Sequence, residues 1–202
     1  WRDLLPLLAR DFTVVAPDLP GHGFTDATGS SQATLAGMAN ALTKLLRVLD
    51  VRPDYAVGHS AGAYNVMMLT LDEHFLRDAG VDAACLRGAA GLAGPYDFLP
   101  FDVDATREAF GRAPDSALTQ PVHFARADAP PLLLLWGEAD TTVGPRNLRG
   151  LATAMGEVGG RVETKTYPGV NHVDIMLALS RPLRGRAPTL DDVAAFVERV
   201  TA

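Results

Sequence analysis

The chain has 202 residues, of which 48% are hydrophobic and 21% charged, and this is the composition of a globular domain rather than of a disordered or fibrous protein. Eighteen Lys and Arg against 24 Asp and Glu give a net charge of −6, so the sequence offers no basic surface for a nucleic-acid backbone. The length suits one folding unit, and we expect a single domain over residues 1–202.

Three further features bear on the setting of the protein. No apolar run approaches the roughly 20 residues that a membrane-spanning helix needs. Cys85 is the single cysteine and cannot form an internal disulfide, which fits a reducing compartment, so we expect a cytoplasmic protein. The first residues after Trp1 already read as the middle of a segment, so we expect either that an N-terminal segment was removed or that the chain is a fragment of a longer one. The sequence does not decide whether the protein forms a homodimer.

The pattern of apolar residues alternates between strand and helix along the chain. Short apolar or alternating runs predict five strands, over residues 12–16, 55–58, 86–92, 132–136 and 162–167. Apolar residues at helical spacing predict a helix over 35–49, another after residue 62, and a last helix from Thr189, which resembles a capping box with Asp192. This alternation indicates an α/β fold with a mostly parallel sheet flanked by helices.

The least regular part of the chain is the polar, proline-containing stretch over residues 98–128. A stretch of this length between two strands is either a lid over an active site or a long surface connection. The sequence does not decide between them.

One motif carries chemistry. Gly58-His59-Ser60-Ala61-Gly62 reads G-x-S-x-G and lies between a predicted strand and a predicted helix. A sharp turn there forces the serine backbone into a strained conformation, which a glycine on either side accommodates. The serine hydroxyl is then exposed above the sheet, and the backbone amide of Ala61 points at an oxyanion that develops there. We therefore predict that Ser60 is a nucleophile.

A nucleophilic serine needs a base and an acid that orients it, and in this kind of fold they follow in the order serine, acid, histidine. Asp140 follows the most apolar strand, and His172 lies in the loop after the next predicted strand. Both loops lie at strand carboxyl ends, where ligands of parallel sheets bind. We predict Asp140 as the acid and His172 as the base.

Two other carboxylates compete for the role of the acid. Asp97 follows the Gly-rich strand over 86–92, and Glu138 lies two residues before Asp140. We expect both to have other roles. Of the remaining histidines, His59 is expected to pack locally within the elbow and His22 to form part of a turn. His74 and His123 are expected on the surface or in loops.

No grouping of His, Cys and carboxylates has metal-ligand spacing beyond His172 with Asp174, which we interpret as part of the histidine loop. We expect no metal and no cofactor.

These motifs resemble the α/β-hydrolase superfamily over the whole chain. The stretch from Val14 to Gly23 is similar to the segment after the fourth strand of that family, and the three loops with Ser60, Asp140 and His172 are similar to its elbow, acid and histidine loops. Residues 1–62 resemble the hydrolase-fold accessory protein of magnesium chelatase, whereas later stretches, such as Gly91 to Asp97, resemble carboxylesterases. The resemblance implies an esterase acting on a small-molecule ester.

The resemblance also implies two departures. The family's N-terminal strands, and the loop that supplies a second oxyanion amide, would precede Trp1, so we expect a hydrolase fold without those strands and weak esterase activity. We also expect the strand over 12–16 to pair directly with the strand over 55–58, or the sheet to borrow a strand from a partner chain. The alternative function is a non-catalytic accessory protein that binds a ligand such as a tetrapyrrole.

Overall fold

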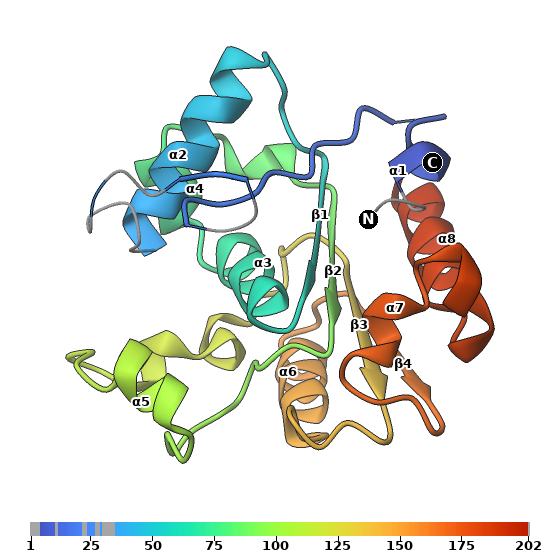
Figure 1. Cartoon of the computed structure of the whole chain (residues 1–202). Helices are drawn as coiled ribbons and strands as arrows, with labels where there is room; N and C mark the ends of the chain where they lie inside the picture. Colours follow the sequence, from blue (N-terminus) through green and yellow to red (C-terminus); the bar gives the residue numbers. More distant parts are fainter. Residues whose placement is uncertain (1–4, 11, 22–23, 27–28, 30–34, 202) are drawn as a thin grey trace.

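The computed structural model describes residues 5–10, 12–21, 24–26, 29 and 35–201 and shows an α/β fold (Figure 1). Among these residues four parallel strands form one sheet in the order β1-β2-β3-β4. The strands are β1 (Tyr55–His59), β2 (Gly88–Leu92), β3 (Leu132–Gly137) and β4 (Val162–Tyr167). The predicted α/β class with a parallel sheet is therefore confirmed, with four strands where five were expected.

Helices connect the strands and cover the sheet. The α-helices are α1 (Leu5–Leu8), α2 (Leu35–Val48), α3 (Ala61–Leu71), α4 (His74–Asp78), α5 (Asp104–Phe110), α6 (Arg146–Glu157), α7 (Asp174–Leu177) and α8 (Thr189–Thr201). Short 3-10 helices are η1 (Ala83–Cys85), η2 (Ala117–Thr119), η3 (Pro121–Phe124) and η4 (Arg181–Arg186). None of the helices in the described ranges is long and apolar enough to cross a membrane.

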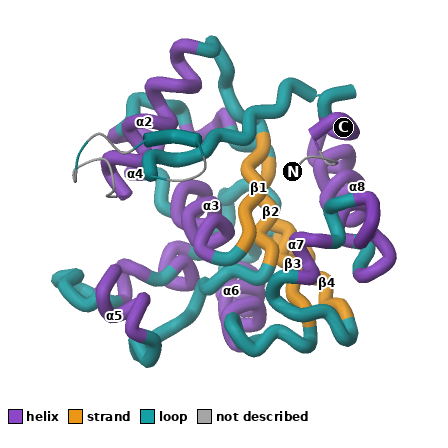
Figure 2. The backbone as a smooth tube through the Cα atoms, viewed as in Figure 1, coloured by secondary structure: helices purple, strands orange, loops and turns teal. Residues whose placement is uncertain are grey.

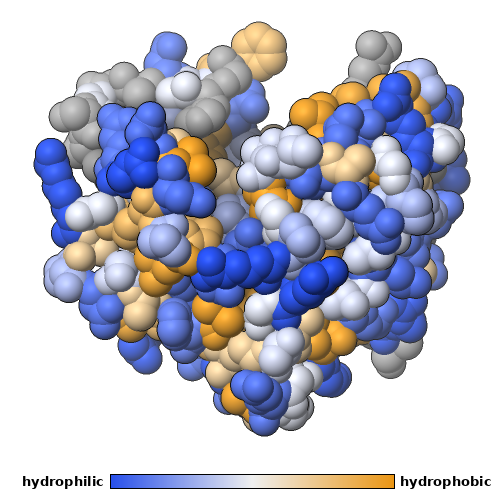
Figure 3. Space-filling model, turned by 90° about the horizontal axis from the view of Figure 1, so that it is seen from below, coloured by the Kyte–Doolittle hydropathy of each residue, from blue (hydrophilic) through white to orange (hydrophobic). Residues whose placement is uncertain are grey.

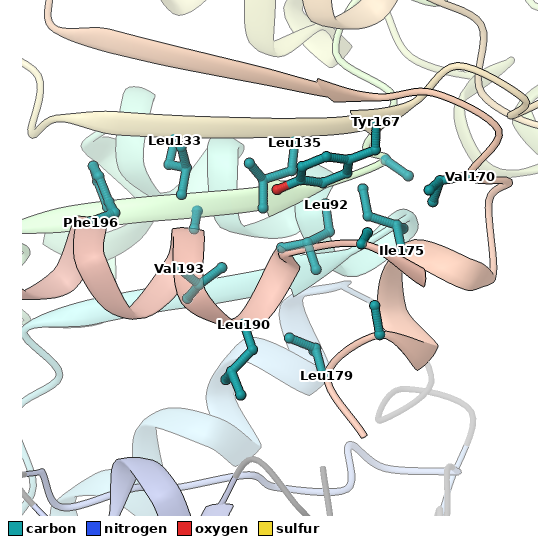
Figure 4. Packing of buried hydrophobic residues seen from close by; sticks show 14 of the residues in the cluster. Leu92, Leu133, Leu135, Tyr167, Val170, Ile175, Leu179, Leu190, Val193 and Phe196 are labelled. Atoms are coloured by element: carbon teal, nitrogen blue, oxygen red, sulfur yellow. The ribbon is translucent and has the colours of Figure 1, made fainter. Parts of the chain in front are cut away.

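The sheet separates two hydrophobic cores, because successive side chains of a strand point to opposite faces. On one face Leu133 and Leu135 of β3 pack with Ile175 of α7 and with Val193 and Phe196 of α8 (Figure 4). On the other face the core brings together residues of β3, α3 and α6, which lie on the opposite side of the sheet in Figures 1 and 2: Leu132, Leu134, Trp136, Ala63, Met67, Leu148 and Leu151. Both faces of the sheet are thus buried at β3, which explains why this strand is apolar along its length, whereas the outer strand β4 is mostly exposed.

The expected strand over 12–16 does not form. These residues lie outside helices and strands, and β1 pairs with β2 without a ladder to them, so the direct pairing with β1 is wrong. The ring of Phe12 nevertheless packs edge-on against Tyr55, with ring centroids 6.3 Å apart. Side-chain packing therefore holds this segment beside β1 without the backbone ladder that defines a strand. Gly23, at the end of the family-like stretch, lies outside the described residues.

Two other local predictions are corrected or refined. The proposed capping box of α8 does not form, because the Thr189 hydroxyl is buried without a hydrogen-bond partner and the Asp192 carboxylate accepts from Tyr167 Oη. The stretch over 98–128 is not one long loop but contains α5, η2 and η3. The stretch folds back on itself, since the buried Gln120 side chain accepts a hydrogen bond from Phe98 N at its start.

Candidate active site

The turn between β1 and α3 places Ser60 at the carboxyl edge of the sheet. Ser60 has φ 54° and ψ −123°, a strained backbone for a residue with a side chain. Hydrogen bonds of both backbone groups stabilise this conformation: Ser60 N donates to Leu92 O of β2, and Ser60 O accepts from Tyr64 N. The predicted strained elbow is therefore present.

The two glycines of the motif are not equivalent. A Cβ at Gly58 would lie 2.3 Å from the carbonyl oxygen of Gly62, so a side chain there would collide with the first turn of α3. A Cβ at Gly62 would meet nothing within 4 Å. Only Gly58 is required to be glycine by close approach, and the expectation for Gly62 is corrected.

His172 lies beside Ser60, although 112 residues separate them in the sequence. It follows β4 after a turn in which Gly169 has φ +71°, a left-handed conformation that favours glycine. The Nε2 atom of His172 is 2.9 Å from Ser60 Oγ, within hydrogen-bond distance. The side chain is 14% exposed, so the ring is mostly shielded but reachable from solvent.

Asp140 completes the line of hydrogen bonds. Its Oδ2 atom is 2.7 Å from His172 Nδ1, and its side chain is fully buried. Its Oδ1 atom accepts from Thr142 N at 2.8 Å and from Val143 N at 2.9 Å. Each oxygen of the buried carboxylate therefore has a donor, as a buried charge requires.

The loops that carry Asp140 and His172 are joined by their backbones. Glu138 N donates to Tyr167 O and Ala139 N donates to Val170 O, both at 3.0 Å. The close approach depends on Gly137, because a Cβ there would lie 2.2 Å from Val170 O. These contacts continue the pairing of β3 with β4 beyond the strand ends and fix the loop of Asp140 relative to the loop of His172.

The competing carboxylates lie elsewhere. Asp97 forms a two-pronged ion pair with Arg146, with distances of 3.0 Å to Nε and 2.7 Å to Nη2. Glu138 accepts a hydrogen bond from the Thr166 hydroxyl at 2.9 Å. These two carboxylates bind Arg146 and Thr166, whereas the carboxylate that hydrogen-bonds to His172 is that of Asp140.

Of the other histidines, His59 lies at the elbow and makes, besides the expected local packing, a contact with His172 that the sequence did not predict. Its Nε2 atom is 2.8 Å from the backbone oxygen of His172, and the two rings lie with centroids 4.8 Å apart. Burial lowers the pKa of His59 below its usual value, so the ring is neutral at pH 7. The signal in the sequence was its alternation with Tyr55 and Val57, which turns its side chain toward the face that α7 and α8 cover.

His74 and His123 lie away from this site, as expected. His74 Nδ1 contacts the Asp72 carboxylate at the start of α4, and His123 is exposed in η3. His22 lies outside the described residues.

Aromatic rings pack beside the elbow. Tyr64, on the first turn of α3, lies 5.8 Å from Phe98 and 5.3 Å from Phe110, measured between ring centroids. Burial raises the pKa of Tyr64 to about 12. This contact joins α5 to the helix that follows Ser60, at the carboxyl edge of the sheet. Figure 3 looks at that edge from below and shows apolar patches between polar side chains.

No group of three or more His, Cys, Asp or Glu residues suited to a metal ion occurs within the described ranges. The pair of His172 with Asp174 gains no third ligand there, and Asp174 binds Arg186 instead.

Comparisons with known proteins agree on the fold. A family model described as alpha/beta hydrolase fold matches residues 1–105. The magnesium-chelatase 30 kDa subunit of Rhodobacter capsulatus is 38% identical over 97 residues, which cover 47% of this chain and 34% of that protein. The chain thus matches about a third of that relative's length.

Solved esterase structures are similar in fold. Apo esterase 2 of Thermogutta terrifontis superposes with a TM-score of 0.59 and 21% identity, covering 82% of this chain and 64% of that one. A truncated carbohydrate esterase from gut microbiota superposes with a TM-score of 0.67 and 16% identity, covering 88% of this chain and 73% of that one. At these identities the likeness is one of fold.

Proposed function

The chain belongs to the alpha/beta hydrolase fold family, and from this premise we propose that it hydrolyses carboxylic esters, with Ser60 as nucleophile, His172 as base and Asp140 as orienting acid. One observation carries the proposal: the hydrogen-bonded line from Asp140 through His172 to Ser60, with distances of 2.7 and 2.9 Å. A nucleophile, a base and a group that orients the base are the requirements of acyl transfer through a covalent intermediate.

In the first half of the reaction Ser60 Oγ attacks the ester carbonyl carbon while His172 Nε2 takes its proton. The carbonyl electrons move to oxygen, and the backbone N–H of Ala61, at the positive end of α3, donates to that oxyanion. The buried Asp140 carboxylate holds the protonated imidazole through Nδ1–H. Collapse of the tetrahedral intermediate expels the alcohol, which takes the proton from His172, and leaves an acyl group on Ser60.

In the second half water repeats the attack on the acyl group. His172 Nε2 takes a proton from the water, the second tetrahedral intermediate forms, and its collapse returns the proton to Ser60 Oγ and releases the carboxylic acid. Every step uses side chains and a backbone amide, so the proposal calls on no cofactor.

The experiment uses a fluorophosphonate probe, which labels an activated serine, together with short p-nitrophenyl esters. We expect the chain to be labelled and to hydrolyse the esters, and we expect Ser60→Ala to lose both activities while keeping its fold. Ser116→Ala is the matched control, because Ser116 is exposed in the connection before η2. Hydrolysis by Ser60→Ala at the rate of the unmodified chain contradicts the proposal.

A second candidate function has its own observation. The magnesium-chelatase 30 kDa subunit is similar over residues that make up 47% of this chain, which favours an accessory protein that binds a tetrapyrrole. Fluorescence titration with a porphyrin tests this candidate directly. Binding of porphyrin by a chain that the fluorophosphonate does not label favours the accessory function over ester hydrolysis.

A further inference from the structure

We propose that His59 is a positioning residue, whose ring holds the backbone of His172 so that the His172 ring stays aimed at Ser60. The proposal rests on the proposed function of Ser60 and His172 and adds a residue to it. The observation behind it is the contact between His59 and the His172 carbonyl. Neither the G-x-S-x-G motif nor the order of the loops predicts this contact.

The strands that precede Ser60 and His172 are not neighbours in the sheet, so a contact between their two loops helps to position them. Ser60 follows β1 and His172 follows β4, and these are the two outer strands in the described sheet order. With about 4.8 Å between neighbouring strands, the ends of β1 and β4 are roughly 14 Å apart. The backbone ladder therefore ties the histidine loop to β3, and its reach back to Ser60 depends on side-chain contacts.

His59 meets this need through its place on β1. It alternates with Tyr55 and Val57, which pack against the core shared with α7 and α8, so its ring points to the face where the histidine loop lies. The ring is half-buried, and its Nε2 atom is 2.8 Å from the backbone oxygen of His172. A carbonyl oxygen only accepts, so Nε2 of His59 carries the hydrogen and donates it.

Two hydrogen-bond contacts join the elbow to His172, one to its backbone and one to its ring. His59 Nε2–H holds the His172 carbonyl, and Ser60 Oγ meets His172 Nε2 at 2.9 Å. Because His59 and Ser60 are neighbours in the chain, any shift of the elbow carries both contact points with it. A displacement of about 1 Å between reacting groups costs on the order of 10²-fold in rate, so holding this distance has catalytic value.

The neutral state of His59 suits this role. The titratable groups that interact electrostatically with its ring are His172 and Asp140. Burial, the largest cause, and the charge of a protonated His172 lower the pKa of His59, whereas its hydrogen bond to the His172 backbone and the charge of Asp140 raise it, and the net shift is downward. A neutral His59 donates its hydrogen bond without repelling the imidazolium that His172 becomes during the reaction.

The test compares His59→Gln, which keeps an N–H donor of similar reach, with His59→Leu, which keeps bulk without a donor. We expect His59→Leu to lower kcat by roughly tenfold or more with KM within about twofold of the unmodified chain. We expect His59→Gln to retain most of kcat. His123→Leu serves as the matched control, because His123 is exposed and lies outside the site. Thermal unfolding midpoints are measured to check that each variant folds.

A second readout does not depend on ester hydrolysis. The Nδ1 proton between His172 and Asp140 gives a low-field proton NMR signal when the ring is fixed, and we expect it in the unmodified chain and in His59→Gln, but broadened in His59→Leu. If no variant hydrolyses esters and the signal changes in this way, the proposed function fails while the positioning role stands. An unchanged signal and unchanged kcat in His59→Leu overturn the positioning role.

The amide variants keep the test decisive if His59→Leu does not fold. His59→Asn carries the same donor on a shorter side chain, and we expect it to fall short of the His172 carbonyl. Loss of kcat and of the low-field signal in His59→Asn, with both retained in His59→Gln, supports the hydrogen bond. Equal loss in both amide variants overturns it.

Discussion

Replacing Asp140 by Asn tests the proposed acid while changing one atom. The Asp140 side chain is fully buried, with Oδ1 accepting from Thr142 N and Val143 N and Oδ2 facing His172 Nδ1. In the variant the amide oxygen is expected to keep the two backbone donors, because only an acceptor fits there. The amide NH2 group then faces His172 Nδ1.

This arrangement reverses the tautomer of His172. An NH2 group donates, so Nδ1 of His172 must accept and the ring hydrogen moves to Nε2. An Nε2–H cannot take the proton of Ser60. In the best-characterised serine protease the equivalent change lowers kcat by about 10⁴ while leaving the geometry intact, and we expect a loss of similar order here.

The assay is hydrolysis of p-nitrophenyl acetate, with Asp97→Asn as the matched control. Asp97 pairs with Arg146, which is 56% exposed, and an exposed ion pair contributes about 0–1 kcal/mol. We therefore expect Asp97→Asn to keep kcat within a few-fold. Equal losses in the two variants, or a larger loss in Asp97→Asn, refute the assignment of the acid.

Two further predictions concern stability. Gly58→Ala places a Cβ 2.3 Å from Gly62 O, so we expect it to lower the thermal unfolding midpoint by roughly 4 °C or more. Gly62→Ala has open space around its Cβ, and we expect its midpoint to stay within about 2 °C of the unmodified chain. Equal midpoints of the two variants in calorimetry contradict the packing argument. Because His59 has a lowered pKa in the folded chain, the unfolded chain binds more protons as the pH falls below 6.5, so the stability that its neutral ring contributes is lost in that range. In thermal melts from about pH 7 to about pH 5, His59→Gln is expected to lose less stability than the unmodified chain, and an equal loss excludes His59 as the source.

The elements that the sequence predicts well are those with a strong local pattern. The alternating run over 162–167 is β4 with the same bounds, and the helical spacing over 35–49 is α2, which ends one residue earlier. The strained turn at Ser60 was also predictable, because a G-x-S-x-G motif between strand and helix defines its own geometry. Residues 12–16 are also apolar and β-branched, yet they form no strand: Phe12 packs against Tyr55 of β1 through its ring, without the backbone hydrogen bonds that a strand shares with its neighbour.

The contacts that the sequence could not predict join segments far apart in the chain. The contact of His59 with the His172 carbonyl spans 113 residues, and the ion pair of Arg146 with Asp97 spans 49. In the second case Asn147 adds to the effect, because its side-chain oxygen accepts from Asp97 N and fixes the backbone at that residue. Two residues at the start of α6 thus hold Asp97 in place, Arg146 by its carboxylate and Asn147 by its backbone N–H. Asp97 is the carboxylate that, from its position after a strand, the sequence offers as an alternative to Asp140.

The sheet order explains why Asp140 rather than Asp97 meets His172. Gly137 at the end of β3 pairs with Tyr167 at the end of β4, so the loops that follow these two strands begin side by side. The loop with Asp97 follows β2, which is one strand farther from β4, or about 4.8 Å more. Asp140 lies three residues beyond its strand and Asp97 five beyond its own, by which point the latter loop has turned toward α6. A carboxylate that follows the strand next to β4 is therefore the one placed to orient a histidine that must itself reach back toward β1.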